Sequence, residues 1–146
     1  MIYLLLCAYA YVHGQTNAFL YSRKGAEALA RNEHRDLTIE RGLVAAAVVA
    51  ACLYSYPLLF VELVAWVLAF SFWHNGAYYV MREKISRGGT ISDMGAINAW
   101  KHQSPTTTAK LDFTYKLRLW LMLASLAALA VGYGVVFYFT TSISGL

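Results

Sequence analysis

The lysine and arginine residues of this chain of 146 residues fall in two segments, and this distribution limits the fold more than any other feature. The segments run from residue 23 to 41 and from residue 82 to 118, and together they hold all 12 basic residues. Long apolar stretches with almost no charge surround them. Because short basic loops stay on the cytoplasmic side of a membrane, the pattern predicts inner loops at 22–40 and 82–116 and both termini outside.

The composition also favours a membrane protein. Hydrophobic residues make up 59% of the chain and charged residues only 14%, whereas about 25% charged residues is usual for a soluble domain. A bilayer accommodates such a chain in apolar spans of about 20 residues. We therefore expect one all-α domain over residues 1–146, an integral membrane four-helix bundle in a bacterial-type inner (plasma) membrane. Its multi-pass spans are expected at residues 2–21, 41–55, 57–82 and 116–140.

Two elements of this bundle can be predicted in more detail. The second span is rich in alanine, and small residues let helices approach closely in lipid, so we expect it to be the central, protein-facing helix. In the second inner loop, Ser92 and Asp93 are suitable caps for a short helix that ends near Trp100. We expect this short helix to lie at the inner membrane interface.

Polar residues inside the predicted spans are the candidates for a functional site. They are His13, Gln15 and Asn17 in the first span and Glu62, His74 and Asn75 in the third. His13 lies ten residues before Arg23 and His74 eight residues before Arg82, which places both histidines in the inner half of the bilayer, roughly 15 and 12 Å from those arginines. We expect both rings to face the bundle interior, with Gln15, Asn17 or Asn75 as hydrogen-bond partners.

Three interpretations of the histidines remain open. They can be hydrogen-bonded contacts between helices, axial ligands of a haem b between the first and third spans, or part of a proton-handling or small-ligand site. The first interpretation needs no cofactor, and we expect none, with haem b as the alternative. The sequence has no nucleophile, phosphate-loop or zinc-protease motif, so we expect neither a catalytic residue nor a metal site.

Glu62 is the one acidic residue away from the predicted inner side. It follows Pro57 by five residues, roughly 7 Å along the helix. We expect its carboxylate to extend to the outer interface or to meet Tyr54 or Tyr56. The alternative is a protonatable group in an outward half-channel.

The basic residues of the second segment are candidates for binding anionic lipids or a partner at the inner face, because positive charge near the membrane attracts anionic headgroups. These residues are Arg82, Lys84, Arg87, Lys101, Lys110, Lys116 and Arg118. The net charge of +4 comes without a basic run that contains aromatic residues, so we expect no nucleic-acid partner. The expected partners are the lipid bilayer, other membrane subunits and a second copy of the chain.

Residues 74–82 (HNGAYYVMR), together with Trp100 and residues 104–109 (SPTTTA), resemble a pattern found in small four-span membrane proteins of bacteria and phages. The resemblance implies a four-helix membrane fold and attaches no activity to it. We therefore expect a small membrane protein that acts as a structural, accessory or partner-binding subunit without catalysis of its own. The alternatives are a holin-like membrane-active phage protein and a haem or proton-handling subunit that uses His13 and His74.

Overall fold

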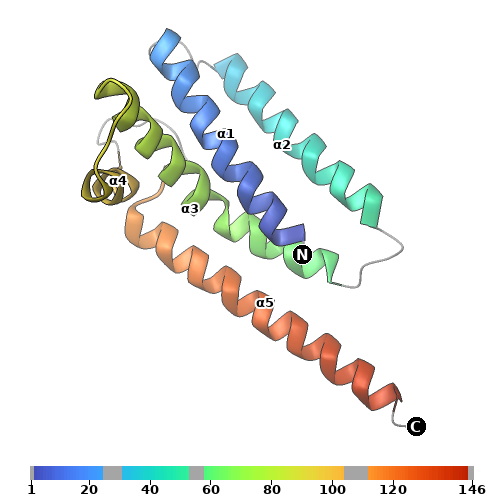
Figure 1. Ribbon diagram of the computed structural model, residues 1–146. Helices are drawn as coiled ribbons and strands as arrows, with labels where there is room; N and C mark the ends of the chain where they lie inside the picture. The colour runs from blue at the N-terminus through green and yellow to red at the C-terminus, as the bar shows by residue number, and fades with distance from the viewer. Residues whose placement is uncertain (1, 25–30, 53–57, 104–111, 145–146) are drawn as a thin grey trace.

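The computed structural model describes residues 2–24, 31–52, 58–103 and 112–144. Within these ranges the chain forms five helices and no strand (Figure 1). The helices are α1 (Ile2–Lys24), α2 (Arg31–Cys52), α3 (Leu59–Ser86), α4 (Asp93–Trp100) and α5 (Tyr115–Ser144). The predicted all-α class is therefore confirmed for the described part of the chain.

Two of the described helices, α3 and α5, are long and apolar enough to cross a membrane. The polar run from His13 to Asn17 lowers the hydropathy of α1. Several charged residues, among them Arg31 and Glu40, do the same for α2, which begins ten residues before the expected start of the second span. Membrane crossing by α1 and α2 therefore stays a prediction, and so does the four-span bundle.

The central helix is α3, because it contacts all four of the other helices and packs most extensively against α1. The expectation that the alanine-rich second span is central is wrong. α2 makes only a small contact with α3, and its Ala46 and Ala47 are exposed. The close approach takes place instead between α1 and α3. Ala10, Gly14 and Ala18 form a buried row at four-residue spacing on α1, which places them on one helix face.

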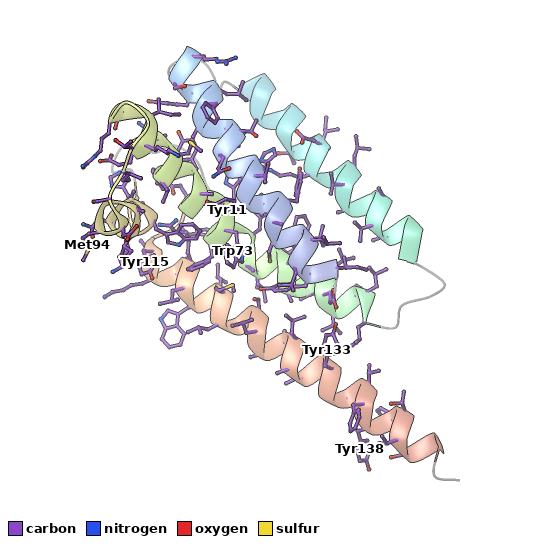
Figure 2. All side chains as sticks on the ribbon, in the orientation of Figure 1. Tyr11, Trp73, Met94, Tyr115, Tyr133 and Tyr138 are labelled. Atoms are coloured by element: carbon purple, nitrogen blue, oxygen red, sulfur yellow. The ribbon has the colours of Figure 1, made fainter. Side chains whose placement is uncertain are left out.

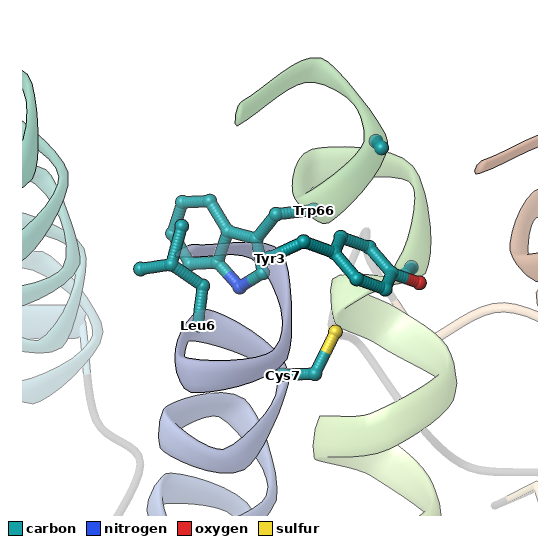
Figure 3. Packing of buried hydrophobic residues seen from close by; sticks show 6 residues of the cluster. Tyr3, Leu6, Cys7 and Trp66 are labelled. Atoms are coloured by element: carbon teal, nitrogen blue, oxygen red, sulfur yellow. The ribbon is translucent and has the colours of Figure 1, made fainter. Parts of the chain in front are cut away.

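The α1–α3 interface continues into a hydrophobic core near the start of α1 (Figure 3). Tyr3, Leu6 and Cys7 of α1 pack there against Trp66 and two neighbouring alanines of α3. The Tyr3 hydroxyl also lies 3.0 Å from the Ser125 hydroxyl of α5, so one side chain joins three helices.

The short helix α4 confirms the capping prediction, since the Ser92 hydroxyl accepts a hydrogen bond from the amide nitrogen of Gly95 at 3.2 Å. At its other end the Trp100 ring packs on Gly76 of α3, where even a Cβ atom would overlap the indole. The guanidinium group of Arg118 donates to the carbonyl oxygens of Trp100 and His102, at 3.2 and 2.7 Å. Arg118 thereby joins the first turn of α5 to the end of α4.

One narrow stripe of α5 contacts the rest of the molecule, and most of its remaining surface is exposed. Arg118, Ser125 and Gly132 belong to this stripe, at the seven-residue spacing that keeps side chains on one helix face. Large apolar side chains around the other faces remain exposed, for example Trp120 and Phe137, each at 70%. The second half of α5 extends beyond the other helices, as the position of Tyr138 in Figure 2 shows.

Candidate functional site

Polar side chains from α1, α2 and α3 meet in a cluster formed by His13, Asn17, Arg41, His74 and Asn75, which we call the histidine cluster. The rings of His13 and His74 lie 5.3 Å apart between their centroids. The Arg41 guanidinium lies between them, with Nη2 at 3.4 Å from His13 Nδ1 and 3.2 Å from His74 Nε2. His13 and Asn17 are buried, with 5% and 3% of their surfaces exposed.

The chemistry of the partners fixes the protons of this cluster. A guanidinium group can only donate hydrogen bonds, so His13 Nδ1 and His74 Nε2 must both accept. His74 Nε2 also receives the amide Nδ2 of Asn17 at 3.0 Å. The proton of His74 therefore sits on Nδ1, which donates to Asn75 Oδ1 at 2.9 Å. Both imidazoles are neutral in this arrangement, and Arg41 carries its positive charge.

The hydrogen bonds continue in one direction from the histidine cluster to Asp112. With its Oδ1 occupied by His74, Asn75 donates through Nδ2 to Asp112 Oδ1 at 3.4 Å. Tyr79 donates its hydroxyl to the other carboxylate oxygen, Asp112 Oδ2, at 2.6 Å. The Arg41 cation on α2 and the Asp112 carboxylate just before α5 are thus connected through His74 and Asn75 of α3. Each of these neutral side chains accepts a hydrogen bond on the Arg41 side and donates one on the Asp112 side, so the bonds strengthen one another.

The prediction that both histidine rings face other helices agrees with this geometry, and Asn17 and Asn75 are among the partners that the sequence indicated. Gln15 is half-buried, and its side chain forms no hydrogen bond within the described part of the chain. Sequence reasoning missed Arg41, which was placed at the edge of an inner loop. Consecutive helices of a membrane bundle run antiparallel, as α1 and α2 do (Figure 1). This order could have indicated that Arg41, just before the alanine-rich stretch, lies beside the polar run of α1.

The histidine cluster does not fit a haem held by His13 and His74. A Cβ atom at Gly14 would overlap the carbonyl oxygen of His74, so the backbones of α1 and α3 touch beside the two rings. Arg41 already occupies His13 Nδ1, and Arg41 and Asn17 occupy His74 Nε2. A porphyrin between the rings would require the helices to separate and these hydrogen bonds to break.

Arg41 of α2 donates to both histidine rings, so its removal tests the role of the cluster. Replacing Arg41 with methionine should lower the free energy of unfolding by about 1 kcal/mol, because the two imidazole acceptors lose a charged donor while the apolar stem is retained. Hydrogen exchange followed by mass spectrometry should show faster exchange in α2 than in α3. Arg23→Met, at an exposed position near the end of α1, should leave both rates unchanged. Equal exchange of α2 in the two variants would contradict this role.

Glu62 occupies a second buried polar site, near the beginnings of α1 and α3. Only 1% of its surface is exposed, so the expectation that its carboxylate extends to the outer interface is wrong. One carboxylate oxygen accepts the amide N–H of Tyr3 at 2.5 Å, and the other accepts the hydroxyl of Tyr133. Negative charge at helix N-termini is favourable because the first amide groups point toward it. Tyr54 and Tyr56, its expected partners, lie outside the described residues.

Some basic residues of the second segment are exposed, and others contact groups of the protein. Lys84, Lys101 and Lys116 are exposed, and Lys110 lies outside the described residues. Arg118 is fully buried, so the expectation that it binds lipid at the inner face is wrong. Its guanidinium group instead donates hydrogen bonds to the carbonyl oxygens at the end of α4.

Arg82 and Arg87 lie near the end of α3 with different partners. Arg87 pairs with Glu83, with 2.6 Å between Arg87 Nε and the carboxylate. The Arg82 guanidinium stacks on the Tyr21 ring at 4.2 Å from its centroid, an arrangement that also anchors α1 to α3 at this end.

No family model, curated protein or solved structure matches the chain.

Proposed function

We propose that the protein is a small integral membrane subunit that organises or binds other membrane components and has no catalysis of its own. The observation that carries this proposal is α5, a helix of 30 residues whose apolar side chains are exposed on most faces. Soluble monomers rarely expose a contiguous apolar surface of this size, whereas lipid or a partner helix covers it without cost. In this proposal the second crossing is α3, which is also long and apolar enough to cross a membrane.

The charges at the helix ends support one orientation for this subunit. α1 and α3 run in the same direction, and Tyr21 near the end of α1 contacts Arg82 near the end of α3. α5 starts at the same end of α3, because Tyr79 contacts Asp112 just before it. The exposed basic residues Lys84 and Lys116 therefore share one end of the molecule, which we call the basic end. We propose that this end faces the cytoplasm of a bacterial-type cell, with both termini outside.

The histidine cluster supports a structural role in preference to proton transfer. Its hydrogen bonds link three helices, and such contacts stabilise helices in lipid by about 1 kcal/mol each. The hydrogen-bonded path from the cluster to Asp112 passes through Asn75, whose amide does not titrate as imidazole or carboxylate groups do. We therefore infer that the chain from Arg41 to Asp112 holds the helices in register.

A holin-like protein is the alternative within the same membrane class. Holin-like lesions require copies of the chain to assemble around a polar lining, but the polar residues of α1 and α3 contact each other inside one copy. We therefore expect that induced expression in bacteria leaves growth intact. Rapid lysis on induction would favour the holin alternative.

The membrane proposal predicts that alkaline carbonate leaves the protein in the pellet of isolated membranes, because apolar helices in a bilayer do not depend on charge for binding. Reporter enzymes fused after Gly88 and after Leu146 should report the cytoplasm and the outside, respectively. A soluble protein after carbonate treatment would contradict membrane insertion. A pelleted protein with an external reporter at Gly88 would contradict only the orientation.

A further inference from the structure

A groove of about 590 Å³ lies at the basic end, between the last turns of α1 and α3 and the inward side of α4. Arg82, Ser86 and Arg87 of α3 line it together with Tyr21 of α1 and Asn98 of α4. Its volume lies in the range of small-molecule sites. Its lining combines positive charge with hydroxyl and amide groups, which are hydrogen-bonding partners for an oxygen-rich anion.

Arg82 supplies the groove with guanidinium N–H donors for a ligand. Its guanidinium lies 4.2 Å from the centre of the Tyr21 ring and 5.6 Å from that of Tyr78. These ring contacts do not use all five N–H donors of the guanidinium, so donors remain for bidentate recognition of an anion. Within the described part of the chain no carboxylate forms an ion pair with Arg82.

The acidic residue in the groove does not cancel this charge. Glu83 lies 2.6 Å from Arg87, so these two side chains neutralise each other. The positive charge of Arg82 remains, and the groove has a net attraction for anions. Arg82 is held by two aromatic rings before a ligand arrives, which reduces the entropy that binding must remove.

We propose that this groove binds a negatively charged phosphate ester, with Arg82 as the principal contact. The proposal rests on the proposed membrane function, because the groove opens at the end of the molecule that we place at the inner headgroup layer. An anionic phospholipid headgroup and a soluble phosphate share the required chemistry. Bidentate hydrogen bonds from arginine to phosphate oxygens supply the recognition.

The test uses the full chain in an uncharged maltoside detergent, titrated calorimetrically with dihexanoyl phosphatidylglycerol, dihexanoyl phosphatidylcholine or inorganic phosphate. We expect the phosphatidylglycerol to bind about tenfold more tightly than the phosphatidylcholine, and Arg82→Gln to weaken its binding about tenfold. Lys84→Gln, the matched control, removes the same charge from an exposed position outside the groove and should change the affinity less than about twofold. Arg82→Lys keeps the charge and the ring contact and should give an intermediate affinity.

Equal losses in Arg82→Gln and Lys84→Gln would overturn the proposal, because the attraction would then belong to the whole basic end. Equal binding of the two lipids, or no binding of any probe, would also overturn it. Inorganic phosphate that binds as tightly as phosphatidylglycerol would support the site and identify a soluble phosphate as its source. Carbonate extraction separates this outcome from the proposed function, since Arg82→Gln should stay in the membrane pellet and keep the helical content of the parent.

Discussion

Replacing Gly14 with alanine should lower the free energy of unfolding by about 3 kcal/mol, although alanine is the better helix former. The added Cβ would overlap the carbonyl oxygen of His74. The helix backbones fix the positions of both atoms, so neither can rotate away. α1 and α3 would have to separate along the row that includes Ala10 and Ala18. Titration with sodium dodecyl sulfate in mixed micelles, followed by circular dichroism, measures the loss.

Gly134→Ala provides the matched control for this substitution. A Cβ atom at Gly134 meets nothing within 4 Å, so alanine there should leave stability unchanged or raise it by up to about 1 kcal/mol through helix propensity. Unchanged stability in both variants would mean that α1 and α3 do not touch at Gly14.

The second large effect is expected for Glu62→Leu, which should destabilise the protein by about 3 kcal/mol. The substitution removes the acceptor of the Tyr3 amide and of the Tyr133 hydroxyl, and the amide of the buried Tyr3 then remains without this partner. It also removes negative charge from the beginnings of α1 and α3. The same detergent titration measures the change.

Tyr133→Phe separates the contact of Glu62 with Tyr133 from its contact with Tyr3, because it removes only the hydroxyl. Its expected cost is about 1 kcal/mol. If Glu62→Leu were as stable as the parent, the carboxylate would be hydrated in solution, and its contact with α1 would contribute nothing.

Local chemistry explains the parts of the fold that the sequence predicted well. The cap of α4 depends on Ser92 and on an amide three residues later, so nearby residues contain all of the information. The helices also follow from long apolar stretches whose ends carry polar residues. Arrangement in space is different, because the alanines of α2 and the row around Gly14 offer equally small surfaces, and only the packing shows that α3 takes α1 as its partner.

The candidate site was predictable where one residue type limits the outcome. Uncharged polar side chains such as Asn17 and the histidines need partners away from water, so their pairing could be expected before the partners were known. Charged residues are harder to place, because a charge in an apolar sequence usually indicates the membrane boundary. Arg41 and Glu62 instead lie among donors and acceptors supplied by distant segments, and those segments cannot be identified from the neighbouring sequence.

The packing of α1 on α3 also sets an order for biosynthesis. The main partner of α1 is not the helix that follows it in the chain, and the contact between Tyr3 and Glu62 joins residues separated by 59 positions. A ribosome therefore finishes α1 and α2 before the surface that covers Ala10 and Gly14 exists. Until α3 emerges, Asn17 lacks its partner His74, so the contacts that hold α1 in place form only after the third helix has been translated.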